Sequence, residues 1–400
     1  MRVLHIGKYF PPFSGGMENF LADLLDESSA QGLECAALVH DHSHGELPEQ
    51  ETLNNNLIVR VRSYGQLLFA PISPRFRGKL RTLIKSFQPD VIDIHLPNTS
   101  AFFLIFLIVA RRIPWVIHWH SDVVFPADKP ILGLAYKLYC PFEWYLLKRS
   151  RAIIATSPNY LQTSTTLKPY LQKCSVIPLT LNEARMPQLT NSLHEKARKL
   201  WNTGAQGDRP LRVLCIGRLT HYKGHDLLID AVTKISQETA SVSVLIVGEG
   251  ELKEALEQQV ADARLTARVK LLGHQSELIL NALLANCDVF CLPSTMRTEA
   301  FGLVLLEAMY YGKPSIVSNI EGSGMTWVIG DAENGWHVPA GDADALAQKL
   351  IDLQQHPEQL TEAGQHARKS FDQGFSARHC VEQTIAVYEQ CISQLKVPGH

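Results

Sequence analysis

Residues 212–224 read RVLCIGRLTHYKG, and this stretch decides the fold. Its apolar run ends at Gly217 and a helical pattern begins at His225, so it predicts a strand, a turn and a helix. The stretch also restarts a series, because short runs rich in Val and Ile alternate with helical segments on both sides of it. The predicted strands are Val3–Gly7, Cys35–His40, Ile58–Arg62, Val91–His95, Trp115–His120, Ala152–Thr156 and Cys174–Pro178, then Arg212–Gly217, Val242–Gly248, Val269–Gly273, Val289–Leu292, Ser315–Ser318 and Trp336–Val338. We therefore predict an α/β fold with two doubly wound, Rossmann-like domains in tandem.

The composition is that of a globular protein, with 46% hydrophobic and 20% charged residues among 400. A formal net charge of −2 gives no reason to expect a nucleic-acid partner. The eight cysteines lack CxxC or Cys/His spacing, so we expect neither a zinc module nor a disulfide scaffold, and a reducing cytoplasm fits best. The most apolar run, residues 101–110, has about half of the roughly 20 residues that span a bilayer. We expect it to form a buried core helix.

Two loops of the first half follow predicted strands, where open α/β sheets bind their ligands. Gly15 and Gly16 precede an amphipathic helix, and a glycine-flanked helix start can receive an anion. The alternative is a plain strand-to-helix turn. The fifth strand ends in His118-Trp119-His120-Ser121-Asp122, and strand alternation puts both histidines on one side. His120, at the carboxyl end, is the candidate contact to a reacting sugar, and the alternative is a satisfied core or strand-end histidine.

The second half offers two further groups of candidate residues. Arg218 and Lys223 straddle the turn after a strand, where two cations beside a helix start could neutralise a pyrophosphate. Glu307 lies in an apolar run, where a carboxylate needs a hydrogen-bonding partner such as a pair of sugar hydroxyls. Glu299 cannot share its helix face, so we expect Glu299 in the preceding loop, next to the free amides of a helix N-terminus. The alternatives are ordinary surface cations and two surface glutamates.

Taken together, these features resemble the retaining, nucleotide-sugar-dependent glycosyltransferases of family 4. The resemblance covers nearly the whole chain in the expected order. It rests on the Glu299 and Glu307 pair, Gly217-Arg218 with Lys223-Gly224, Gly15-Gly16 with Glu18, His120, and the tail 335–347. It implies a GT-B fold with an acceptor-side domain at 1–182, a donor-side domain at 183–374 and a helix at 375–400 that crosses back onto the first domain.

The resemblance also implies roles for single residues. Arg218 and Lys223 would neutralise the departing diphosphate, Glu299 would bind the transferred sugar, and Glu307 would hold the donor ribose. The other implied donor contacts are Gly15, Gly16 and the amides of Phe301, Gly302 and Leu303, with His120 at the reacting carbon and Glu18 and Asp122 on the acceptor. His120, Arg218, Lys223 and Glu299 form the implied catalytic group. No Asp-x-Asp metal motif accompanies them, so we expect no metal and no cofactor, with a GDP- or UDP-linked sugar as co-substrate.

Two local variants point to the sugar. The segments 178–182 (PLTLN) and 321–326 (EGSGMT) depart from the common family pattern, and the second, together with HWHSD at 118–122, is similar to mannosyltransferases of bacterial O-antigen and exopolysaccharide assembly. We expect transfer of a hexose, with mannose favoured, to a lipid-linked or cell-surface glycan. The alternatives are a nucleotide-sugar 2-epimerase and a non-catalytic nucleotide- or glycan-binding module.

A basic segment raises the question of a membrane partner. From Arg75 to Lys85, cations surround apolar residues at helical spacing, which could dock the first domain on an anionic membrane. The alternative is a helix packed on its own sheet with a solvated basic face. With the first interpretation, the protein would be cytoplasmic and peripheral on the inner face of the plasma membrane.

Overall fold

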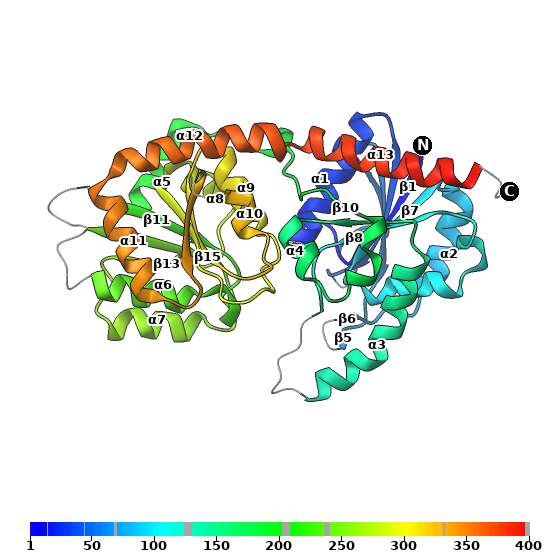
Figure 1. Ribbon diagram of the computed structural model, residues 1–400, viewed down its shortest axis with the longest axis horizontal. Helices are drawn as coiled ribbons and strands as arrows, with labels where there is room; N and C mark the ends of the chain where they lie inside the picture. Colours follow the sequence, from blue (N-terminus) through cyan, green and yellow to red (C-terminus); the bar gives the residue numbers. More distant parts are fainter. Residues whose placement is uncertain are drawn as a thin grey trace. The chain divides into compact units, whose positions relative to one another are not determined.

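The computed structural model describes residues 1–13, 15–43, 45–67, 70–123, 130–201, 209–235, 241–330 and 333–396. The chain divides into two compact units, Met1–Asn182 with Ala377–His400, and Glu183–Ser376. In both units helices flank the two faces of a sheet (Figure 1). Among the described helices, none is long and apolar enough to cross a membrane.

The first unit is built on a mainly parallel sheet of eight described strands, in the order β10-β9-β8-β7-β1-β2-β4-β3. Its strands are β1 (Arg2–Ile6), β2 (Glu34–Asp41), β3 (Gln50–Leu53), β4 (Asn56–Arg62), β7 (Val91–Leu96), β8 (Trp115–Trp119), β9 (Ala152–Ala155) and β10 (Cys174–Val176), with a separate hairpin of β5 (Gln66–Leu67) and β6 (Ala70–Pro71). All seven strands predicted in this half are confirmed. The antiparallel edge strand β3 was not predicted, because its polar residues QETL carry no apolar pattern.

The helices of the first unit come from both ends of the chain. They are α1 (Gly16–Ala30), α2 (Phe76–Phe87), α3 (Pro130–Arg149), α4 (Pro158–Thr163) and α13 (Ala377–Lys396), with 3₁₀ helices η1 (Thr99–Phe106), η2 (Ile108–Ala110) and η3 (Lys168–Lys173). Cys380, Val387, Tyr388 and Cys391 of α13 join the core beside β1, β2 and β7. The last helix therefore packs with the N-terminal strands.

Burial bears on two expectations about this unit, a core helix at 101–110 and an apolar membrane contact by α2. The run 101–110 is not a buried core helix: it forms η1 and η2, and Phe106 and Ile108 are 54% and 77% exposed. Only one side of a short 3₁₀ helix can face the core. Because this run is apolar on every side, the residues on its outer side remain exposed. In α2, by contrast, Phe76, Leu80, Leu83 and Ile84 are buried. The basic side chains Arg75, Arg77, Arg81 and Lys85 are exposed, so α2 has no apolar face left for a membrane.

The second unit is a parallel sheet of six described strands in the order β13-β12-β11-β14-β15-β16. Its strands are β11 (Leu211–Ile216), β12 (Val242–Val247), β13 (Val269–Leu271), β14 (Val289–Leu292), β15 (Ser315–Asn319) and β16 (Gly335–Pro339). Its helices are η4 (Glu183–Arg185), α5 (Asn191–Leu200), η5 (His221–Lys223), α6 (His225–Ile235), α7 (Lys253–Asp262), α8 (Glu277–Asn286), α9 (Leu303–Tyr310), α10 (Met325–Ile329), α11 (Ala343–Gln355) and α12 (Pro357–Gly374). Every strand predicted for this half is confirmed.

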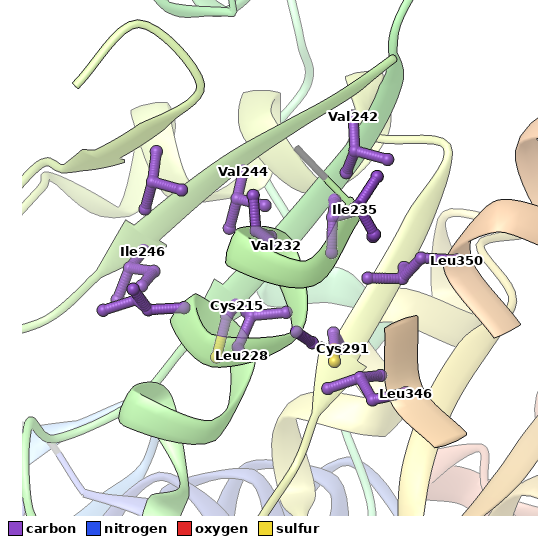
Figure 2. Packing of buried hydrophobic residues seen from close by; sticks show 14 of the residues in the cluster. Cys215, Leu228, Val232, Ile235, Val242, Val244, Ile246, Cys291, Leu346 and Leu350 are labelled. Carbon is purple, nitrogen blue, oxygen red and sulfur yellow. The ribbon is translucent and has the colours of Figure 1, made fainter. Parts of the chain in front are cut away.

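The stretch that opened the second series of strands lies at the centre of this unit's core. Figure 2 shows Cys215 of β11 and Cys291 of β14 among side chains of α6, β12 and α11. The labelled neighbours are Leu228, Val232, Ile235, Val242, Val244, Ile246, Leu346 and Leu350. Burial on this scale fixes β11 and α6, so the turn between them leaves the sheet at a defined place.

Candidate active site

The turn after β11 is held against the loop after β14. Gly224 has φ +68°, and a Cβ there would lie 2.1 Å from the carbonyl oxygen of Pro293, so only glycine permits this approach. The amide of Thr295 donates to the carbonyl of Tyr222 at 2.8 Å. The two loops therefore meet at the carboxyl ends of two adjacent strands, as the strand order requires.

This packing brings two predicted site residues into contact, because the Lys223 ammonium forms a charged hydrogen bond with Oε2 of Glu299. Both side chains are mostly buried, with 13% and 11% exposed. The buried Ser294 hydroxyl also donates to Glu299 Oε2, at 3.3 Å. Burial disfavours the charged amine, but Glu299, with smaller contributions from Tyr222 and Cys215, outweighs it and raises the pKa of Lys223. The strand ends therefore carry a permanent ammonium.

Arg218 occupies the same turn, with an exposed side chain and a fixed backbone. Its carbonyl accepts a hydrogen bond from Nε2 of the buried His225 at 3.1 Å. The other ring nitrogen of His225 accepts from the Cys215 thiol at 3.3 Å, since burial lowers the pKa of His225 to about 4 and raises that of Cys215 to about 12. The sequence analysis missed His225 and Cys215, because a His and a Cys ten residues apart carry no recognisable spacing.

Glu299 lies in the loop before α9, as predicted, and Gly302 caps that helix with φ +78°. The Ser323 hydroxyl donates to the Glu299 carbonyl at 2.5 Å, and the Gly324 amide donates to Ala300 at 2.7 Å. The Phe301 ring is buried near Trp327 and Phe375, so only its backbone is available to a ligand. The first amides of a helix have no intrahelical acceptor, which suits Gly302 and Leu303 to receive an anion or hydroxyl.

Glu307 is half-buried on α9. The pKa of the nearby Tyr311 is raised, first by burial and then by its neighbours Tyr310 and Glu307. The structure thus puts one carboxylate in the loop and one on the helix, as the sequence predicted. The role of Glu307 as a ribose ligand stays a prediction.

In the first unit, Gly15 and Gly16 lie at the start of α1, and Gly15 is its N-cap. A Cβ on Gly15 would lie 2.2 Å from Oε2 of Glu18, so the Glu18 carboxylate folds back over the start of the helix. Only 7% of Glu18 is exposed. A phosphate arriving here would have to displace this negative charge, whereas a hydroxyl group could donate to it.

His120 is buried at the carboxyl end of β8, at the end of a chain of histidines on neighbouring strands. His5 Nδ1 lies 3.3 Å from His95 Nε2, and His95 Nδ1 lies 3.1 Å from His120 Nε2. Asp93 lies beside the start of the chain, 3.5 Å from His5 Nδ1. It also accepts from the His118 ring at 2.8 Å and from the Tyr388 hydroxyl of α13.

Asp93 determines the direction in which the hydrogen bonds between these histidines run. Burial would raise the pKa of Asp93, but His118, which hydrogen-bonds the carboxylate, holds it below its ordinary value, so Asp93 only accepts. We infer that His5 Nδ1 carries its proton, because the Asp93 carboxylate lies 3.5 Å away, and that it donates toward His95 Nε2. Burial lowers the pKa of His5 to about 4 and of His120 to about 3 and depresses that of His95, so each ring is neutral with a single N–H. His95 then donates to His120 Nε2, and the proton of His120 is on Nδ1.

The outer nitrogen of His120 is thus a buried donor, and among the described residues no acceptor contacts it. An unsatisfied buried N–H is costly and favours an incoming oxygen atom. His5, Asp93 and His95 also place three ligand atoms within 4.8 Å of one another, close enough for a metal ion. The hydrogen bonds from His118 and Tyr388 already occupy Asp93, which favours the hydrogen-bonded chain. The sequence analysis found His120 but not this support, in which hydrogen-bonded partners are as much as 295 residues apart.

Asp122, the other predicted acceptor contact, is held by its neighbours. Its Oδ1 accepts from the Trp119 indole at 3.1 Å and from the Ser164 hydroxyl at 2.7 Å. The nearby Glu143 of α3 is 1% exposed, and burial raises its pKa to about 7, despite a hydrogen bond from Tyr139 and with a further contribution from Asp122. Asp122 is therefore part of a polar group that continues into α3.

Comparison with known proteins identifies the class. The model for "Glycosyltransferase Family 4" matches residues 14–185, and that for "Glycosyl transferases group 1" matches residues 199–370. The chain is 30% identical over 397 residues to the "O-antigen chain mannosyltransferase C" of Escherichia coli, covering 97% of this chain and 98% of that protein. It is 31% identical to the "D-rhamnosyltransferase WbpZ" of Pseudomonas aeruginosa, covering 94% and 93%.

A solved structure agrees with the fold. Anabaena HepE, crystallised with UDP and glucose, superposes with a TM-score of 0.74 at 22% identity, over 98% of this chain and all of that one. The fold is GT-B.

The chain belongs to glycosyltransferase family 4. It is a hexosyltransferase, and the retaining, metal-independent transfer that the resemblance implied is consistent with this family and fold. The comparisons lend no support to a 2-epimerase.

Proposed function

We propose that this enzyme transfers mannose from GDP-mannose, or a related hexose from a GDP- or UDP-linked donor, to a lipid-linked bacterial surface glycan. The mannosyl- and rhamnosyltransferase relatives support the choice of sugar and the class of acceptor. The observation that carries the proposal is the Lys223 and Glu299 pair beside Arg218 at the strand ends of the second unit.

The proposed chemistry follows from these charges. As the glycosidic bond breaks, negative charge develops on the diphosphate, and Lys223 and Arg218 neutralise it. Glu299 is then free to accept hydrogen bonds from the sugar, and Glu307 holds the ribose. The acceptor hydroxyl attacks the face that the diphosphate leaves and gives its proton to a departing phosphate oxygen. These steps need positioned charges but no enzyme nucleophile.

The first unit, residues 1–182 with 375–400, is proposed to be the acceptor side, and residues 183–374 the donor side. In this proposal the Glu18 carboxylate turns from the start of α1 toward the acceptor hydroxyl, which opens Gly15 and Gly16 to the phosphates. Asp122 also orients the acceptor, and His120 donates from Nδ1 to a sugar oxygen. Its neutral ring supports this donor role, since a buried neutral imidazole adds no charge of its own beside the sugar.

The proposed location is the cytoplasmic face of the plasma membrane, where such acceptors are assembled. In this proposal the exposed cations of α2, Arg75 to Lys85, attract anionic lipid, but their contribution is electrostatic only, since the apolar face of α2 is buried.

The test is a panel of GDP- and UDP-linked hexoses with a lipid-linked glycan extract, read as released nucleoside diphosphate and as the anomeric proton signal of the product. We expect release that depends on the acceptor and a product that keeps the donor's configuration. Conversion of the donor without acceptor would indicate an epimerase, and binding without consumption would indicate a binding module.

A further inference from the structure

Large apolar side chains are exposed on one part of the first unit, along α3 and the neighbouring 3₁₀ helices. Leu134 and Leu138 are 64% and 69% exposed. Phe106, Ile108, Phe142 and Trp144 are exposed as well. Figure 1 shows the N-terminal half of α3 projecting away from the sheet of its unit. Such a concentration is unusual on a protein surface that meets only water.

The exposed residues of α3 form one continuous face. At about 100° per residue, Leu134, Leu138, Phe142 and Tyr145 fall within about 80° of the helix circumference. Lys137, Trp144 and Lys148 lie on the adjoining side, and the Lys148 ammonium is 4.6 Å from the centre of the Trp144 ring. The opposite side, with Glu143, Leu146 and Leu147, is buried.

The face continues onto the 3₁₀ helices. The Phe142 ring stacks on Phe102 at 5.3 Å and lies 6.4 Å from Phe106. At the C-terminal end of α3, the Arg149 guanidinium donates to the carbonyl of Arg111. We call the exposed residues of α3, η1 and η2, with Arg111 and Arg112, the α3 surface.

The charge of the α3 surface has one sign. Residues 99–121 and 130–149 contain Arg111, Arg112, Lys137, Lys148 and Arg149 but a single acidic residue, Glu143. Glu143 is on the buried side and burial raises its pKa to about 7, so it adds little negative charge to the exposed face.

We propose that the α3 surface docks on the surface of an anionic phospholipid bilayer. Leucine and phenylalanine side chains enter the acyl boundary, Trp144 and Tyr145 suit the interface, and the lysines and arginines reach the anionic headgroups. This inference rests on the proposed function, because a lipid-linked acceptor requires an enzyme at a membrane. It moves the apolar contact from α2, where the sequence suggested it, to α3.

Vesicle flotation of the full chain tests the docking. We expect binding to vesicles of phosphatidylcholine with phosphatidylglycerol, weaker binding to phosphatidylcholine alone, and release by salt. Lys137→Gln with Lys148→Gln should lower partitioning roughly 25-fold, because the attraction of each lysine to the anionic surface is worth about 1 kcal/mol. Leu134→Ser with Leu138→Ser should lower it more than tenfold. The matched apolar control, Leu53→Ser with Leu278→Ser, changes exposed leucines away from the α3 surface and should bind like the wild type.

Three outcomes would overturn the proposal. The first is that the protein does not bind anionic vesicles. The second is that Arg77→Gln with Arg81→Gln of α2 abolishes binding while the α3 variants do not. The third is that the protein is a dimer in solution and the leucine variants dissociate it. Quenching of tryptophan emission by brominated lipid, lost in Trp144→Phe, locates the contact directly. Flotation needs no donor, so transfer to a detergent-solubilised acceptor without flotation would reject only the docking, and flotation without transfer would reject only the proposed function.

Discussion

The two units place chemically opposite groups at the same point of similar sheets. In the second unit, a charged pair, Lys223 and Glu299, stands at the strand ends with the exposed guanidinium of Arg218. In the first unit, the strand ends carry neutral imidazoles leading to His120, with the charge of Asp93 kept deep below them. The difference shows how one topology can provide charge for a departing diphosphate and uncharged hydrogen bonds for a sugar.

The largest expected effect is on the charged side. Arg218→Ala and Lys223→Ala should each lower kcat about 10²–10³-fold, because each removes a charge that stabilises the developing diphosphate. Steady-state kinetics with a saturating donor measures this. The control is Lys253→Ala, whose lysine pairs with Glu249 on the exposed surface. A normal kcat in both site variants would remove the basis of the comparison.

The next effect concerns an acid that the first unit keeps buried. The folded-state pKa of Glu143 is raised from 4.5 to about 7, so its stabilising contribution is complete below pH 4.5 and is lost as the pH rises through about 7. Glu143→Gln removes this dependence. Above pH 7 the free energy of unfolding of the variant should therefore be about 3 kcal/mol larger than that of the wild type. Urea unfolding at about pH 5 and about pH 8 gives the difference, with the exposed Glu254→Gln as control. An equal gain at both pH values would contradict the assigned pKa.

A smaller effect tests the neutral side. His95→Phe removes the donor to His120 Nε2, so the His120 proton should redistribute between the two nitrogens, and kcat/KM should fall roughly fivefold, the worth of one hydrogen bond. The ¹⁵N shifts of the His120 ring report the tautomer directly. Tyr388→Phe removes a different partner of Asp93 and should leave the tautomer of His120 unchanged. A proton on Nε2 in the wild type would reverse the deduced chain.

The smallest expected effect is none at all. Because Arg218 and Lys223 provide the positive charge, EDTA should leave the rate of donor turnover unchanged. Loss of turnover in EDTA and its recovery with Mn²⁺ or Mg²⁺ would show that a metal ion shares this task.

The sequence could predict features that are local along the chain. The strand, turn and helix of 212–235 and the place of Glu299 before α9 follow from apolar spacing and glycines, and the structure confirms both. The histidine chain could not be predicted, because His5, Asp93 and Tyr388 come together only through strand order and the return of α13. The run 101–110 was predicted wrongly, since apolar composition alone does not distinguish a buried helix from 3₁₀ turns with exposed apolar residues.

The central claim is that Lys223 and Arg218 cradle a diphosphate without a metal ion. Calorimetric binding of the free nucleoside and of its diphosphate, both in EDTA, tests this most directly. We predict that the diphosphate binds the wild type more tightly than the nucleoside does, and that this margin shrinks in Lys223→Ala and in Arg218→Ala while nucleoside binding stays the same. An unchanged margin in both variants would contradict the claim.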